Sequence, residues 1–440
     1  MKLSGWGCFS TINVATTAPR DAEGVAAAVR EGDLIARGNG RAYGDSALNR
    51  HNTVQTRFLN RIISFNAETG QLVADAGVLL GDVINAFLPQ GWFPHVTPGT
   101  KFVTLGGMVA ADVHGKNHHG YGSFRHCVEW IDLCQANGQI LRCTPDENAE
   151  LFDWTFGGMG LTGVITRIGL RLMPVESAWI KQETIPAPNL DAAIDRMEAS
   201  GNATYSVAWI DCLSMGRNLG RSILMLGEHA KIEDLKPWLR KKPFEIKAKA
   251  KRSVPFTPPG FMLNGATVRA FNAVYYRQGV RNAGTALVDW DTYFYPLDAI
   301  LGWNKIYGRK GFMQFQCGLP LETSRAGLKA LLRQISFAGA GSFLAVLKRL
   351  GPQDGSFSFP MEGYTLALDF PVNAKTTRLM NRLDQITLDH GGRFYLAKDA
   401  RMSAETLRAS DPRVAAFVEA RDALGIRGHF KSEQSERLSL

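Results

Sequence analysis

Residues 36–49, ARGNGRAYGDSALN, overlap a short apolar segment, DLIARG at 33–38, that we expect to be a β-strand. Glycines at 38, 40 and 44 let backbone N–H groups crowd against an anion, and Arg37 and Arg41 add charge-assisted donors. The spacing is not G-x-G-x-x-G and no clear βαβ unit follows, which disfavours a nicotinamide-type Rossmann site. Taken alone, this loop is either an anion-binding loop or a tight surface turn.

Two further glycine-rich segments favour the first alternative. TPGTKFVTLGGMVAADVHGKNHHGYGS, at 97–123, places threonines and glycines ahead of a group of histidines. FGGMGLTGVIT, at 156–166, runs into an alternating segment at 163–175 that predicts a strand. Three such loops within the first 166 residues indicate a large cofactor with two phosphates and a flat ring system.

The histidines of the second loop raise the alternative of a metal site. His114 and His118 have the i, i+4 spacing of helical zinc ligands, but Gly115 and Gly120 argue against a helix, and no glutamate lies between the two histidines. We therefore expect no metal. At least one of His118 and His119 is expected to be an ordinary hydrogen-bonded side chain, whereas His114 directly precedes Gly115 in the cofactor-like loop.

The rest of the chain predicts an α+β protein with at least two domains, because 440 residues exceed one typical domain. Before Pro174, helices are expected at 21–32 and 80–88, and a β-hairpin at 127–145 with its turn at 136–138. After Pro174, long alternating segments predict a largely antiparallel sheet with helices on one face. The predicted strands of this sheet are at 205–213, 220–229, 311–320 and 363–372. Helices are expected at 324–336 and 374–391, followed by a helical tail at 404–424.

Composition excludes several classes of protein. The chain is 45% hydrophobic and 21% charged, which is ordinary for a soluble enzyme and unlike a disordered protein. The N-terminal residues lack the apolar region of a secretory signal, and no apolar run approaches the length of a membrane span. The six scattered cysteines form no C-x-x-C pair, so a reducing, cytoplasmic setting is expected.

The net charge of +9 is unevenly distributed. Between 236 and 252 there are eight basic residues and one acid, with aromatic residues interleaved or close behind; they are Lys236, Arg240, Lys241, Lys242, Lys247, Lys249, Lys251 and Arg252, the acid Glu245, and the rings of Trp238, Phe244, Phe256 and Phe261. The segment is either a solvated surface loop or a contact with anionic lipid headgroups. No nucleic-acid-binding motif accompanies it, so nucleic acid is not expected as a partner.

Together the loops resemble the flavoenzyme superfamily of vanillyl-alcohol oxidase and p-cresol methylhydroxylase (PCMH). RGNGRAYGD at 37–45, TPGTKFVTLGG at 97–107 and GGMGLTGVIT at 157–166 match this family in order. The resemblance implies a two-domain, PCMH-type α+β flavoprotein. We expect an FAD domain at 1–178, an antiparallel-sheet substrate domain at 179–392, and a segment at 393–440 that returns to the FAD domain.

The resemblance also implies which residues bind the cofactor and the substrate. FAD would contact Ala36, Arg37, Gly38, Asn39, Gly40, Arg41, Ala42, Tyr43, Gly44, Asp45, Gly99, Thr100, Thr104, Gly106, Gly107, His114, Gly115, Lys116, Asn117, Gly163, Val164, Ile165 and Tyr395. The substrate would contact Tyr43, Tyr295, Gln314, Gln316, Lys348, Thr365 and Lys398. Many relatives attach FAD to a histidine of the first loop. Since Arg41 and Ala42 stand there, FAD should be non-covalent.

HGKNHH at 114–119 and YLAKDAR at 395–401 narrow the resemblance within the family. They are similar to a member that oxidises the 2′-hydroxyl of a polyprenyl-phosphate-linked pentofuranose, the first half of an epimerisation from the ribose to the arabinose form in cell-envelope biosynthesis. This similarity implies a short-chain dehydrogenase/reductase partner in the pathway, and a location in the cytoplasm or at the inner face of the membrane. Thr365 and Ala367 replace an asparagine and a cysteine of that member, so we expect the polarity of the cavity, and with it the preference for the sugar, to differ more than the chemistry.

Oxidation of an alcohol at a flavin requires a hydride acceptor and a base for the hydroxyl proton. Lys398 is expected to supply positive charge, and His114 or Tyr43 to take the proton. Gln314 and Gln316, at alternate positions of a strand, should face the same side and bind sugar hydroxyls. The alternatives are a flavin oxidase of free alditols or sugar lactones, a metal-dependent hydrolase, and a non-enzymatic binding protein.

Overall fold

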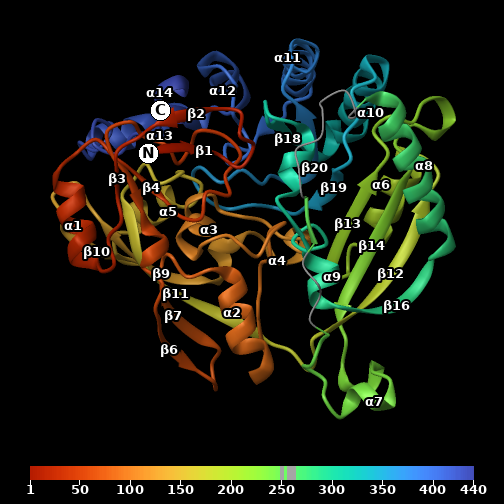
Figure 1. The fold of residues 1–440 in the computed structure, drawn as a ribbon, viewed down its shortest axis with the longest axis horizontal. Helices are drawn as coiled ribbons and strands as arrows, with labels where there is room; N and C mark the ends of the chain where they lie inside the picture. Colours follow the sequence, from red (N-terminus) through yellow and green to blue (C-terminus); the bar gives the residue numbers. More distant parts are fainter. Residues whose placement is uncertain (248–251, 255–263) are drawn as a thin grey trace.

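A computed structural model describes residues 1–247, 252–254 and 264–440. Two large antiparallel sheets lie side by side, and the N- and C-terminal segments meet at the edge of the first one (Figure 1). Within the described residues, no helix combines the length and the apolar character needed to cross a bilayer. Lys249, Lys251, Phe256 and Phe261 of the basic segment lie outside the described residues.

The first sheet has the order β10-β9-β11-β7-β6, and β8 also pairs with β11. Its strands are β6 (Ile62–Asn66), β7 (Gln71–Asp75), β8 (Trp92–Pro94), β9 (Val128–Cys134), β10 (Ile140–Cys143) and β11 (Val164–Pro174). The predicted hairpin at 127–145 and the predicted strand at 163–175 are confirmed as β9–β10 and β11. A hairpin of β1 (Lys2–Ser4) and β2 (Thr11–Asn13) and a small parallel sheet of β3 (Thr16–Thr17), β4 (Ile35–Arg37) and β5 (Thr53–Gln55) lie beside it.

The helices of this part connect the strands and carry the loops. They are α1 (Ala22–Arg30), α2 (Leu80–Phe87), α3 (Leu105–Ala110), α4 (His118–Tyr121) and α5 (Ala149–Thr155), and α1 and α2 confirm the predicted helices. Asp21 caps α1 by accepting a hydrogen bond from the Gly24 N–H, and Thr104 caps α3 by accepting one from the Gly107 N–H. The Thr104 cap fixes where α3 begins within the second glycine-rich loop.

The second sheet has the order β16-β12-β14-β13-β19-β20-β18-β21, and all its pairs are antiparallel. Its strands are β12 (Trp179–Ala187), β13 (Tyr205–Ile210), β14 (Ser222–His229), β16 (Gly284–Asp289), β18 (Phe312–Pro320), β19 (Ala345–Leu350), β20 (Gly363–Pro371) and β21 (Arg393–Phe394). Four of them are the strands predicted from alternation. Short elements around this sheet are α7 (Pro237–Arg240), β15 (Arg252–Ser253), α9 (Trp290–Phe294) and β17 (Ile300–Leu301).

Helices cover both faces of the second sheet, so the expectation of helices on one face is wrong in part. On one face, α6 (Leu190–Ala199), α10 (Leu321–Ala338) and α11 (Ala374–Asp389) bury a core that includes Ala208, Leu347 and Leu366. On the other face, the Tyr275 ring of α8 (Gly265–Arg281) lies 4.6 Å from the Trp209 ring of β13, centroid to centroid. The alternation of one strand cannot tell that a helix covers its second face.

The C-terminal residues return to the first part of the chain. The predicted helical tail forms α12 (Ala404–Ser410) and α13 (Arg413–Ala423), which are separate because Pro412 interrupts them, and α14 (Glu433–Leu438) follows. The Leu34 N–H donates to the His429 carbonyl at 2.9 Å, and Phe430 packs in one apolar cluster with Val25. These contacts place the chain ends together beside β4, the strand that leads into the first glycine loop (Figure 1).

Candidate active site

A cavity of about 430 Å³ lies between the glycine loops of the first part and one face of the second sheet. Most of the residues that the sequence singles out line it. From the loops these are Ala36, Gly38, Asn39, Gly40, Arg41, Ala42, Tyr43, Gly99, Thr100, Thr104, Gly106, Gly107, His114, Lys116, Gly163 and Ile165. From the second sheet and the C-terminal segment they are Gln314, Gln316, Lys348, Thr365, Tyr395 and Lys398.

Close packing between the first two glycine loops explains two of their residues. A Cβ on Gly38 would lie 2.2 Å from Thr104 Oγ1, so no larger residue fits where the loops cross. Gly40 has a φ of +62°, in the left-handed region that other residues rarely adopt. The loops therefore form one wall with their backbone turned to the cavity.

Arg41 supplies a positive charge to this wall. Its guanidinium carbon lies 4.2 Å from the centre of the Trp6 ring and 5.1 Å from that of Phe102, so two aromatic rings hold it in place. Burial lowers the pKa of Arg41, and its buried Nε has no partner among the described residues. An arginine so held is ready to pair with a phosphate, which restores the hydrogen bonds that burial removed.

The wall fits FAD on observations of this structure. Arg41 Nε, Thr97 Oγ1 and His114 Nδ1 are buried without a partner among the described residues, and all three residues line the cavity. An added Cβ on Gly99 would meet no atom within 4 Å, so a ligand can approach the backbone there. Unpaired buried donors and acceptors are costly unless a ligand completes them. These atoms and the open backbone suit a ligand with phosphates and a flat ring.

His114 sits at the centre of the cavity wall. Its ring lies 5.4 Å from the Tyr395 ring and 5.7 Å from the Phe359 ring, and its Nε2 lies 3.3 Å from Gln316 Nε2. Burial, followed by the charges of Lys348, His118 and Lys398, holds the pKa of His114 well below its usual value. His114 is therefore a neutral imidazole at neutral pH, with one ring nitrogen able to accept a proton.

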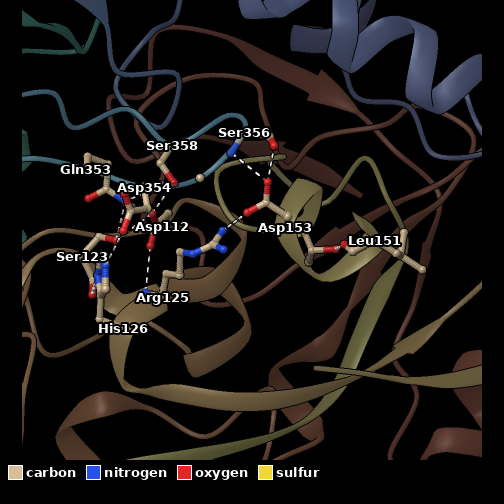
Figure 2. A network of polar contacts seen from close by, with 12 residues as sticks. Asp112, Ser123, Arg125, His126, Leu151, Asp153, Gln353, Asp354, Ser356 and Ser358 are labelled. Carbon is tan, nitrogen blue, oxygen red and sulfur yellow. Dashed lines mark hydrogen bonds and ion pairs between the residues drawn. The ribbon is translucent and has the colours of Figure 1, made fainter. Parts of the chain in front are cut away.

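A network around Asp112 holds the histidine loop in place (Figure 2). The buried Asp112 carboxylate accepts hydrogen bonds from Ser123 Oγ at 2.8 Å, from the Arg125 N–H at 3.0 Å and from Ser358 Oγ. A second carboxylate, Asp153, accepts from Arg125 Nη1 and from the Ser356 N–H. Residues 353–358 connect β19 to β20, so these bonds fasten the histidine loop to the second sheet.

His118 and His119 belong to this supporting structure. His118 Nε2 lies 2.8 Å from Gln353 Oε1 and its Nδ1 accepts from the Gly351 N–H, while His119 Nε2 donates to the Ala203 carbonyl. The expectation that at least one of them is an ordinary hydrogen-bonded side chain is confirmed for both. In the part of the chain that the structure describes, no three His, Cys, Asp or Glu side chains gather as metal ligands.

The opposite wall is one face of the second sheet, and strand register places its polar groups together. Gln316 pairs with Ala367, and Lys348 pairs with Thr365, so their side chains share a face. Gln314 and Gln316 both line the cavity while Phe315 between them packs in the core behind, as their alternation predicts. Gln316 Nε2 also donates to Thr365 Oγ1 at 3.2 Å.

Three half-buried lysines give this cavity a positive character. The Lys398 Nζ lies 3.9 Å from the centre of the Tyr43 ring, and the Lys116 Nζ lies 4.1 Å from that of Tyr293. Burial lowers the pKa of Lys348 to about 8 and, with the charge of Lys348, that of Lys116 to about 7. An anionic ligand would reverse these shifts, so the site favours one.

Asp369 is a polar residue of this site that sequence reasoning missed. Its buried carboxylate accepts a hydrogen bond from Gln314 Nε2 at 2.6 Å. Burial raises the pKa of Asp369 and lowers that of Lys398, and the charge of each group opposes the shift of the other. Asp369 stands two and four residues after Ala367 and Thr365, so alternation along 363–372 carried a signal for it.

Seven predicted site residues do not line the cavity: Arg37, Gly44, Asp45, Gly115, Asn117, Val164 and Tyr295. Three of them hold loops from behind. Arg37 Nη2 donates to the Ser4 carbonyl at 2.8 Å, Asp45 forms an ion pair with Arg437 at 2.8 Å, and Asn117 Nδ2 donates to the His95 carbonyl at 2.7 Å. Arg37, Asp45 and the Asn117 amide nitrogen thus have protein partners that support the loops, while Asn117 Oδ1 has no partner among the described residues.

Packing or strand direction turns the side-chain positions of the other four away from the cavity. Successive residues of a strand face opposite sides, so Ile165 lines the cavity while Val164 packs in the cluster of α1. A Cβ on Gly44 would lie 2.0 Å from the Asp399 carbonyl oxygen, and one on Gly115 would lie 2.5 Å from Asn117 Oδ1. Tyr295 is 1% exposed and packs against the Trp290 ring.

Comparisons with known proteins agree with this geometry. A family model described as an FAD binding domain matches residues 15–144. Decaprenylphosphoryl-beta-D-ribose oxidase of Mycolicibacterium smegmatis (strain ATCC 700084 / mc(2)155) is 36% identical over an alignment of 454 residues that covers 100% of this chain and 97% of the relative. An uncharacterized protein of Streptomyces coelicolor is 32% identical over 80% of this chain and 97% of its own length.

A more distant relative matches over a shorter region. L-gulonolactone oxidase of Bos taurus is 25% identical over 205 residues, which cover 45% of this chain and 46% of that protein. The family model covers the first two glycine loops, which line the cavity, and the match to the Mycolicibacterium relative covers the whole chain. The chain belongs to the PCMH-type family of FAD-dependent oxidoreductases.

Proposed function

We propose that the protein oxidises the 2′-hydroxyl of a ribose-type pentofuranose carried on a polyprenyl phosphate, and that the product is the 2′-keto sugar. One observation carries the proposal: the glycine loops that fit FAD face a sheet surface that presents two glutamines beside half-buried lysines. The glutamines suit sugar hydroxyls, and the lysines suit a phosphate. The substrate named for the Mycolicibacterium relative has both parts.

The wall from Ala36 to Gly107, with His114, Gly163, Ile165 and Tyr395, would hold FAD, which supplies a two-electron acceptor for alcohol oxidation when it is bound. The alcohol carbon gives up a hydride and its hydroxyl gives up a proton, which leaves a ketone. Gln314 and Gln316 orient the sugar hydroxyls, and Lys348 pairs with the phosphate.

The proton of the reacting hydroxyl has one acceptor that the geometry favours. His114 is neutral, and its Nε2, which lies 3.3 Å from the Gln316 Nε2 donor, is the ring nitrogen that can accept a proton. Burial and the charge of Asp369 hold the pKa of Tyr43 well above its usual value, so the phenol keeps its own proton. His114 is therefore the proposed base, Tyr43 packs beneath Lys398, and the Lys398 ammonium stabilises charge that develops on the substrate oxygen.

Anaerobic mixing with candidate substrates tests the proposal. Polyprenyl-phosphoryl ribose should bleach the flavin absorbance of the purified enzyme, and mass spectrometry should find a product two mass units lighter. Free alditols and sugar lactones should be at least about a hundredfold poorer, because they lack the phosphate and its charge-assisted pairing. Equal rates with a free alditol would favour the alternative, a flavin oxidase of free sugars.

FAD is proposed to be non-covalent, and the wall has Arg41 and Ala42 where many relatives carry the attached histidine. Acid precipitation of the purified protein should leave the yellow colour in the supernatant, measured by its absorbance near 450 nm. The His114→Ala variant, which removes the histidine that lines the cavity, is the control for attachment at this second loop. Yellow colour that stays in the wild-type pellet would contradict the proposal. Its loss from the pellet of the variant would then place the attachment at His114.

The segment Lys236–Lys247 is proposed to rest on anionic lipid. Trp238, on α7, is 66% exposed, and Lys236 Nζ lies 5.4 Å from its ring centre. At low salt the protein should co-sediment with vesicles that contain about 30% phosphatidylserine, and Trp238→Ala should weaken this binding by about tenfold, since an interfacial ring contributes roughly 1 kcal/mol or more. Phe337→Ala, which removes another exposed ring on α10, is the control. A protein that ignores such vesicles would contradict the lipid contact.

A partner activity completes the proposed epimerisation. A 2′-keto sugar becomes the arabinose form when a hydride returns to the keto carbon from the opposite face, which a short-chain dehydrogenase/reductase with a nicotinamide cofactor would supply. Coupling the two purified enzymes should convert the lipid-linked ribose to the arabinose form. Recovery of ribose alone would contradict this place in the reaction sequence.

A further inference from the structure

The face of the second sheet that lines the cavity changes from polar to apolar across the strands. At the β18–β20 side it presents Gln314, Gln316 and Thr365, which are polar. Ala367 then pairs with Val346, and Val346 also lies opposite Trp209. Val207 on β13 pairs with Met225 on β14, so the same face continues as an apolar surface.

This apolar side is part of the same cavity. We name it the apolar arm, and it consists of Val207, Trp209, Met225, Tyr275, Leu344 and Val346, all of which line the cavity. Helix α8 covers it, since the Tyr275 and Trp209 rings are 4.6 Å apart and a Cβ on Gly279 would meet Ile223. The loops that fit FAD lie at the other end, so the cofactor leaves the arm without an occupant.

Lys348 stands where the polar part of the face meets the apolar arm. It follows Val346 by two residues on β19, and both side chains line the cavity. Two residues of a strand span about 7 Å, so a chain of one or two isoprene units on a phosphate paired with Lys348 is long enough to reach Val346. A linear apolar group that is attached to this phosphate on the side away from the glutamines would enter the arm.

We propose that the apolar arm beneath α8 binds the first isoprene units of the lipid tail, with Lys348 holding the phosphate at its entrance. The inference rests on the proposed function and deepens it, because it assigns the tail to named side chains. Burial of an isoprenoid chain removes its methylene and methyl groups from water, so affinity should depend on chain length until the arm is full. The sugar and the glutamines then stay on the cofactor side.

The test measures binding of prenyl monophosphates to the FAD-loaded enzyme by isothermal titration calorimetry, below their micelle concentrations. Dimethylallyl, geranyl, farnesyl and geranylgeranyl monophosphates form the series. We expect the affinity to rise by about tenfold from dimethylallyl to geranyl phosphate, to rise again at farnesyl, and then to level off. Equal affinities across the series would overturn the inference.

Filling the arm should remove this dependence on chain length. Val346→Trp places a large ring in the arm, so the variant should bind dimethylallyl phosphate no more tightly than the wild type does and gain less than about threefold from longer chains. Leu344→Trp, just before the first residue of β19, is the second variant in case the first does not fold. FAD content and melting temperature establish folding. A full chain-length gain in either folded variant would overturn the inference.

Val274→Trp is the matched control, because Val274 is on α8 but is 62% exposed and does not line the cavity. It should leave the series unchanged, and a loss equal to that of Val346→Trp would place the tail outside the arm and overturn the inference. The proposed function fails separately, if prenyl-phosphoryl ribose binds with the expected dependence on chain length but does not bleach the flavin.

Discussion

The Lys398→Met variant should reduce flavin about a thousandfold more slowly than the wild type at saturating lipid-linked substrate. Lys398 lines the cavity between the cofactor loops and the sheet, and its Nζ lies over the Tyr43 ring at 3.9 Å. Methionine keeps the length and the apolar stem but removes the charge. Loss of one group that stabilises charge in a buried site typically costs a factor of about 10² to 10³.

Stopped-flow absorbance under anaerobic conditions measures this rate apart from the later reoxidation. The matched control is Lys375→Met, since Lys375 is exposed on α11. It should retain the wild-type rate. If Lys398→Met slows reduction by less than about tenfold while FAD content is unchanged, the charge of Lys398 is not needed for the chemistry and its assigned role is wrong.

Much of the cofactor wall could be predicted from sequence because its signals are local. Gly38, Gly40 and Arg41 lie within four residues of one another, and their character as a backbone-lined, basic loop does not depend on distant contacts. The alternation of Gln314 and Gln316 around Phe315 likewise places both glutamines on one face. Period-two patterning fixes direction once a strand forms.

The rest of the site depends on contacts between residues far apart in the chain. The Asp112 carboxylate that anchors the histidine loop accepts a hydrogen bond from Ser358, 246 residues later, and no local sequence pattern predicts that pair. Asp45 and Asn117 have the residue types of a binding loop, yet Arg437 pairs with the Asp45 carboxylate and the Asn117 amide nitrogen donates to the His95 carbonyl. Sequence proximity therefore overestimated which loop residues reach the cavity.

Register between strands decides the remaining side chains. Gln314 lies opposite Asp369 only because β18 and β20 pair in one register, and a slip by one residue would turn the carboxylate to the other face. The same pairing sets Val346 opposite both Ala367 and Trp209, which creates the apolar arm. These juxtapositions are properties of the folded sheet and are not contained in any one strand.

Replacing Asp369 by asparagine should move the alkaline limb of the pH–rate profile for flavin reduction about one unit toward lower pH. The Asp369 carboxylate raises the pKa of Lys398, which burial and the charge of Lys348 lower. Without that carboxylate, Lys398 loses its proton at a lower pH, so the ammonium form disappears earlier as the pH rises. At a pH above the pKa of Lys398 in both the wild type and the variant, a shift of one unit leaves about ten times less enzyme with a protonated Lys398.

The groups that face Lys398 each bear on this outcome. Tyr43 stays neutral because its pKa is raised, His114 stays neutral because its pKa is lowered, and Lys348, with a pKa of about 8, adds a second alkaline step. The amide introduced by Asp369→Asn can still bond to Gln314, so the variant changes charge more than shape. Asp389→Asn, at an exposed position on α11, is the control and should leave the profile unchanged.

The direction in which the alkaline limb moves in Asp369→Asn decides the role of Asp369. A limb that moves to lower pH means that Asp369 is ionised in the working enzyme and positions the proton on Lys398. An unmoved limb, with a rate that falls equally at every pH, would contradict this and assign Asp369 only the hydrogen bond to Gln314. If the acid limb of the profile moves to lower pH and the alkaline limb does not move, neutral Lys398, rather than His114, takes the substrate proton.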